Sequence, residues 1–153
     1  MRLPYGVYRV IFSGICGIIF SLLFVTPLLS SFGSFAFLQF LLKPAFHHVC
    51  HQLPGKSFTI CSQKMMVCAR CAGIYSGLFS GSIAGLFITA IGAVNRKKLA
   101  AAAILPMAAD VILTNIGFYQ YSLWIACGSG IIFGFIIAIL IQYTLSKKEN
   151  SEV

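Results

Sequence analysis

The chain has 153 residues, of which 59% are hydrophobic and only 9% are charged. A water-soluble domain carries about a quarter charged residues, so the composition excludes that class and indicates one integral membrane domain over residues 1–153. The net charge of +8 does not indicate a nucleic-acid partner, because most basic residues flank apolar segments and none are interleaved with aromatic residues in a polar segment. The expected partner is the lipid bilayer.

Four apolar segments approach the ~20 residues that a membrane-spanning helix needs, and they cover residues 10–29, 72–94, 99–118 and 123–145. The sequence therefore predicts an all-α membrane protein with four spans. A Cys/His-rich loop, residues 46–71, connects the first span to the second. A secretory signal is the alternative for the first segment, although its apolar run exceeds the ~7–15 residues usual for a signal.

The second predicted span carries a glycine at every fourth position, which places these residues on one face of a helix. Small residues in such a stripe let a second helix backbone approach closely. We expect tight helix packing there, and the stripe also offers a surface for a homo-oligomer. Its members are Gly73, Gly77, Gly81 and Gly85.

The distribution of basic residues predicts the orientation. Four spans place both termini and the connection after the second span on one side, and this side is the more basic. We therefore expect cytoplasmic termini and an extracytoplasmic Cys/His loop, in the inner (plasma) membrane. The basic residues of the first side are Arg2, Arg9, Arg96, Lys97, Lys98, Lys147 and Lys148, and those of the other side are Lys43, Lys56, Lys64 and Arg70.

The Cys/His loop contains the side chains best suited to hold a metal ion. His47, Cys50 and His51 are spaced so that one helical turn presents them together, and Cys68 and Cys71 form a C-x-x-C pair. Thiolate and imidazole ligands suit Zn²⁺ or another thiophilic transition metal. The predicted ligands are Cys50, His51, Cys68 and Cys71, with His47 as an alternate. A fully ligated ion would be structural, whereas a water in one position would allow catalysis or transport.

The cysteines also allow other uses. Cys68 and Cys71 begin the second span, where the helix N-terminus and Arg70 favour a thiolate, so a thiol–disulfide oxidoreductase is the alternative function. Two structural disulfides, Cys50–Cys61 and Cys68–Cys71, would suit an oxidising compartment. A membrane scaffold whose metal only fixes the loop is the third class.

Asp110 is an acid near the middle of the third predicted span. Such residues face a bundle interior or a cavity, because a charge in the bilayer costs about 2.5–3.5 kcal/mol on insertion scales. We expect an ion or proton pathway, a support for the outer site, or a protonated side chain bonded to neighbouring backbone.

Two motifs carry a resemblance to a known family. The segments Cys50–Phe58 and Cys68–Tyr75, with the later Leu105–Asp110, resemble the "domain of unknown function 2085" family of small predicted prokaryotic membrane proteins. The resemblance implies a membrane location and a shared Cys/His site, but no activity. Lys56 stands where that family usually has Arg.

The redox alternative resembles the quinone-linked four-helix membrane oxidoreductases. They also place C-x-x-C at the start of a span, with a second cysteine pair in the outer loops. Cys50 and Cys61 would supply that pair, and a quinone would be the cofactor under this alternative alone.

Overall fold

A computed structural model of the chain describes residues 5–30, 37, 44, 46–47, 50, 54–60, 63–87 and 96–150. Its long helices are α1 (Tyr5–Ser30), α3 (Ala69–Phe87), α4 (Arg96–Asn115) and α5 (Leu123–Asn150). Between α1 and α3 lie a 3-10 turn, η1 (Pro54–Lys56), and two short strands, β1 (Thr59–Ile60) and β2 (Gln63–Lys64). The strands pair antiparallel, with Thr59 opposite Lys64 and Ile60 opposite Gln63.

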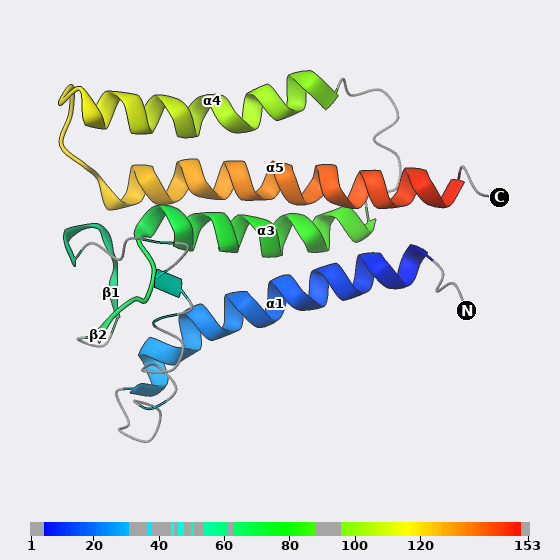
Figure 1. Cartoon of the computed structure of the whole chain (residues 1–153), viewed down its shortest axis with the longest axis horizontal. Helices are drawn as coiled ribbons and strands as arrows, with labels where there is room; N and C mark the ends of the chain where they lie inside the picture. Colours follow the sequence, from blue (N-terminus) through cyan, green and yellow to red (C-terminus); the bar gives the residue numbers. More distant parts are fainter. Residues whose placement is uncertain are drawn as a thin grey trace.

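The long helices lie side by side in the order α4, α5, α3, α1 (Figure 1). Helices that follow one another in the chain run in opposite directions, so the neighbours α3 and α5 run parallel (Figure 1). Both ends of the chain lie at one end of this bundle, and the two strands lie at the other end (Figure 1). The described part of the Cys/His loop therefore lies at the end of the bundle opposite the termini (Figure 1).

In the part of the chain that the structure describes, three helices are long and apolar enough to cross a membrane, over Gly6–Leu28, Arg96–Asn115 and Leu123–Ser146. The described part of α3 ends at Phe87 and contains Arg70 together with several glycine and serine residues. The all-helical fold is confirmed, with three candidate spans among the described residues. Residues 88–94 of the predicted second span lie outside the part of the chain that the structure describes.

The glycine stripe of α3 packs against the backbone of α5. A Cβ atom added at Gly77 or Gly81 would lie less than 3.0 Å from backbone atoms of Ile131 or Phe135. From the other side, Gly130 and Gly134 of α5 face backbone atoms of α3 in the same way. The predicted close approach is thus made within one chain, and association of two copies through the stripe remains a prediction.

A buried polar network joins α1, α3 and α5 near the end that carries the termini. Arg9 donates from Nε to Oε1 of Gln142 at 3.1 Å and from Nη2 to the carbonyl of Gly85. The amide nitrogen of Gln142 donates to Oγ of Ser13 at 3.1 Å and to the carbonyl of Ser82 at 3.2 Å. Arg9 was expected to flank the first span, but it is buried. Its cation lies at the C-terminal end of α3, where the helix dipole favours positive charge.

Adding one methyl group in the stripe is expected to destabilise the protein. Gly77→Ala should lower the free energy of unfolding by about 1–3 kcal/mol, the usual cost of overpacking, because the backbone of α5 would have to move away. Gly128→Ala is the matched control, since nothing lies within 4 Å of a Cβ at that position of α5. Thermal unfolding in detergent measures both, and equal melting temperatures for the two variants would show that the contact is not needed.

Candidate metal centre

Three cysteine sulfurs come together at the end of the bundle away from the termini. The Sγ atoms of Cys50, Cys68 and Cys71 all lie within 4.8 Å of one another. Three sulfurs bound to one tetrahedral zinc lie about 3.8 Å apart, given Zn–S bonds of about 2.3 Å. The observed separations need only a small adjustment to reach that geometry, so the cluster can hold a metal ion.

The start of α3 fixes the positions of these sulfurs. Cys68 directly precedes the first residue of the helix, and its carbonyl accepts the N–H of Ala72 at 2.9 Å. The N–H of Cys68 donates to Sγ of Cys50 at 3.2 Å, which ties the two halves of the motif together. Cys71 follows within the first turn of α3, so the C-x-x-C spacing directs both of its sulfurs toward Cys50.

An apolar cluster surrounds the sulfurs. Its buried members come from α1, from the loop and from α3, and they shield the Cys50 side of the site from solvent, whereas Cys68 and Cys71 remain half-buried. Thiolate–metal bonds are strengthened where water is excluded, because the local dielectric constant is low. The buried members are Leu23, Cys50, Met65, Val67 and Ala72.

The environment of Cys68 favours its thiolate. A hydrogen bond from the Cys71 thiol lowers the pKa of Cys68 to about 5, with help from the Cys50 thiol and from the backbone N–H groups of Cys71 and Arg70, although burial opposes the shift. The same hydrogen bond raises the pKa of Cys71, so Cys68 is the sulfur of the pair whose thiolate is favoured. A thiolate is the form that binds metal ions and the form that attacks disulfides.

The other predicted ligands are His51 and its alternate, His47. His51 lies outside the described residues, as do His48 and Cys61. His47 is exposed and lies one turn before Cys50, and among the described residues the three-sulfur group contains no histidine. Every described cysteine has a free thiol, so neither Cys68 nor Cys71 is in a disulfide here.

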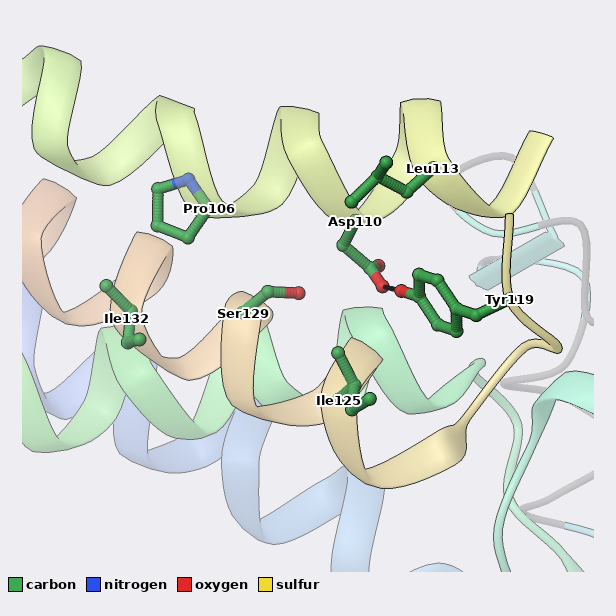
Figure 2. A pocket seen from close by; sticks show the side chains of 7 residues that line it. All are labelled: Pro106, Asp110, Leu113, Tyr119, Ile125, Ser129 and Ile132. Atoms are coloured by element: carbon green, nitrogen blue, oxygen red, sulfur yellow. Dashed lines mark hydrogen bonds between the residues drawn. The ribbon is translucent and has the colours of Figure 1, made fainter. Parts of the chain in front are cut away.

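Asp110 supports this end of the bundle through an ion pair with Arg70. The carboxylate accepts from Nη2 of Arg70 through Oδ2 and from the Tyr119 hydroxyl through Oδ1 (Figure 2). It lies near the end of α4 instead of mid-span, and its side chain is only 3% exposed, against 21% for that of Arg70. Of the three expected roles for Asp110, the geometry favours support of the outer site.

The expected effect of Arg70 on the cysteines needs a correction. The sequence indicated that its positive charge would favour the neighbouring thiolates. The guanidinium instead pairs with Asp110, and the low pKa of Cys68 has hydrogen bonds as its causes. Arg70 therefore lowers the pKa of Cys68 through its backbone N–H, while its charged group pairs with Asp110 of α4.

The turn after α4 brings Tyr119 to Asp110. The N–H of Phe118 donates to the carbonyl of Leu113 at 3.0 Å, and the N–H of Gly117 donates to that of Thr114 at 3.2 Å. This is the Schellman pattern, which requires a left-handed residue after the helix, and Gly117 supplies it with φ of 77°. The helix thus ends abruptly, and the chain returns beside Asp110.

Aromatic residues dock the loop onto α5. The Tyr121 ring lies beneath Nζ of Lys56, 5.1 Å from the ring centroid, and beside the guanidinium of Arg70 at 6.0 Å. The rings of Phe58 and Trp124 are 5.4 Å apart. Burial of Tyr121, followed by the charge of Cys68, raises the pKa of its phenol to about 12, so it stays neutral and acts as a cation–π partner.

Comparison with known proteins places the chain among membrane proteins. A family profile described as "Predicted membrane protein (DUF2085)" matches residues 50–140. A curated relative, "Uncharacterized protein MJ1492" from Methanocaldococcus jannaschii, is 32% identical over 125 residues, which cover 78% of this chain and 80% of the relative. No solved structure matches.

Removing one partner of the buried ion pair should destabilise the bundle. Asp110→Leu leaves the Arg70 cation without its partner and should cost up to about 3–5 kcal/mol, less the screening that the partly exposed Arg70 receives. Asp110→Asn should cost less, because an amide oxygen can still accept a hydrogen bond. The double variant Arg70→Met with Asp110→Leu should lose less than the sum of the two single losses.

Chemical or thermal unfolding in detergent measures the stability of the two single variants and of the double variant. Lys64→Met is the control for the loss of a cation, because Lys64 is exposed in β2, and it should change stability by less than about 0.5 kcal/mol. Strict additivity of the two single variants would contradict a coupled ion pair.

Proposed function

The chain belongs to the DUF2085 family of predicted membrane proteins, and we propose that it binds one thiophilic metal ion, zinc, through Cys50, Cys68 and Cys71. The site stands at the extracytoplasmic end of the bundle. His51 is the fourth ligand in this proposal, and His47 is its alternate.

The observation that carries the proposal is the convergence of three sulfurs from two separate parts of the chain. A C-x-x-C pair alone serves redox exchange as well as metal binding, but Cys50 comes from 18 residues earlier and is held by the N–H of Cys68. A tetrahedral zinc site needs three or four ligands around one ion. Exchange with a Cys50–Cys61 pair would also use Cys50, but it gives no role to the histidines that lie on either side of Cys50 in the sequence.

The fourth ligand decides what the ion does. His51 directly follows Cys50 in the sequence, and as the fourth ligand it would complete a closed Cys₃His site, in which the ion would fix the loop to the start of α3. A water in the fourth position would leave the ion exchangeable, which metal handling, transport or hydrolytic chemistry requires. The close contact of α3 with α5 supports the structural role.

One observation favours a second candidate, a membrane thiol–disulfide oxidoreductase. The C-x-x-C pair stands at a helix N-terminus, and the pKa of Cys68 is lowered to about 5. In this reaction the Cys68 and Cys71 sulfurs would form a disulfide and release two electrons and two protons. A quinone in the membrane would take up both and become a quinol.

Metal analysis separates the two candidates. Protein purified without chelators should contain about one zinc per chain, and Cys50→Ser or Cys68→Ser should remove most of it, while His51→Ala should lower it. Cys127→Ser is the control, because Cys127 lies in α5 outside the three-sulfur group. A metal-free protein with a reducible Cys68–Cys71 bridge and no effect of His51→Ala would instead establish the redox candidate.

The orientation is part of the proposal and has its own test. Basic residues flank the end of the bundle that carries the termini, including Arg96 and Lys98 at the start of α4, and such residues remain in the cytoplasm. An epitope inserted at Gly55, where the backbone is exposed and nothing lies within 4 Å of an added Cβ, should bind an impermeant antibody on spheroplasts.

Val153 should lie in the cytoplasm, so a reporter enzyme fused after it should be active only if it is of a type that works in the cytoplasm. The same epitope at the C-terminus is the control, and it should stay hidden until the membrane is opened. Labelling at the C-terminus but not at Gly55 would reverse the orientation and remove the argument for an extracytoplasmic site.

A further inference from the structure

A cavity of about 360 Å³ lies between α4 and α5, beside the Asp110–Tyr119 contact (Figure 2). Small-molecule sites begin at about 300 Å³, so it is large enough for a ligand. Its rim is apolar and exposed, and both helices are candidate spans, so it opens toward lipid. Its lining consists of Pro106, Asp110, Leu113, Tyr119, Ile125, Ser129 and Ile132.

The hydroxyl groups that line this cavity already donate their hydrogen bonds within the protein. The Tyr119 hydroxyl donates to Asp110, and the Ser129 hydroxyl donates to the carbonyl of Ala126 at 3.1 Å. Asp110 accepts from Tyr119 and from Arg70. Each of these oxygens keeps lone pairs but offers no proton. The small polar part of a mostly apolar lining therefore presents hydrogen-bond acceptors only.

The negative charge at the cavity is already balanced by a neighbouring residue. Arg70 pairs with Asp110 from the side of α3, so the carboxylate already has a cation beside it. A second cation in the cavity would be repelled by Arg70, whereas a neutral hydrogen-bond donor would not be repelled. The remaining lining is aliphatic and includes the ring of Pro106, which has no N–H to donate.

From these features we propose that the cavity binds a neutral single-chain amphiphile whose polar end is a hydroxyl group. The hydroxyl donates to the Asp110–Tyr119–Ser129 acceptors, and the apolar chain lies along Leu113, Ile125 and Ile132. A long-chain alcohol and an alkylated hydroquinone share this chemistry. The site is separate from the three sulfurs and does not depend on a metal being bound there.

Thermal unfolding of the full chain in detergent tests this site, because a ligand that binds the folded state raises the melting temperature. Dodecan-1-ol should stabilise the protein, and its methyl ether, which lacks the donor, should not. Decylhydroquinone and its dimethyl ether form the second pair. Whichever of dodecan-1-ol and decylhydroquinone raises the melting temperature at the lower concentration identifies the type of ligand. Ser129→Ala should weaken binding about 2- to 10-fold, as expected for one hydrogen bond.

Ile132→Trp should abolish the stabilisation, because the larger side chain fills the cavity. The matched control is Ile141→Trp, on the same helix in a second apolar groove of about 300 Å³ that has no carboxylate in its lining. Zinc content should be unchanged in both variants, which separates this site from the metal centre. Equal stabilisation by the alcohols and their ethers, or equal loss in both Trp variants, would show that the cavity holds only bilayer lipid and overturn the proposal.

Discussion

The close contact between α3 and α5 is the constraint on which the rest of this structure depends. Glycines on both helices bring the two backbones together along their length, and Gly130 places α5 directly against the carbonyl of Arg70. Arg70 lies between Cys68 and Cys71, so the contact also holds the first turn of α3 in place. In a bilayer, helices gain little from burying apolar surface, and such backbone contacts are a main source of association. The sulfur site is therefore built on the most tightly packed part of the bundle.

Buried polar groups fasten the two ends of this helix pair. At one end Arg9 and Gln142 connect α1 to α3 and α5; at the other, Arg70 and Asp110 connect α3 to α4. Each group would be costly in lipid without its partner, so each helix is held in one register relative to its neighbours. The Arg70–Asp110 pair also separates two regions with different chemistry. The sulfur cluster faces the loop, and the acceptor-lined cavity faces the lipid between α4 and α5.

The sequence predicted the helices and the cysteine site from local patterns. Apolar length located α1, α4 and α5, the four-residue glycine period identified the tightly packed face of α3, and the C-x-x-C spacing with Cys50 identified the three sulfurs. Contacts between distant residues could not be read in this way. Arg70 pairs with Asp110 only because α4 packs beside α5, and Tyr119 reaches Asp110 only because the chain turns back after Gly117. Arg9 resembles an ordinary flanking residue until Gln142, 133 positions later, is placed beside it.

The central claim is that three cysteines and one further ligand surround a single zinc ion, and X-ray absorption at the zinc edge tests it most directly. In protein reconstituted in lipid, the account predicts about three sulfur neighbours at about 2.3 Å and one nitrogen at about 2.0–2.1 Å. Cys127→Ser should leave this spectrum unchanged. A zinc shell of oxygen and nitrogen alone, with all three sulfurs absent from it, would contradict the account.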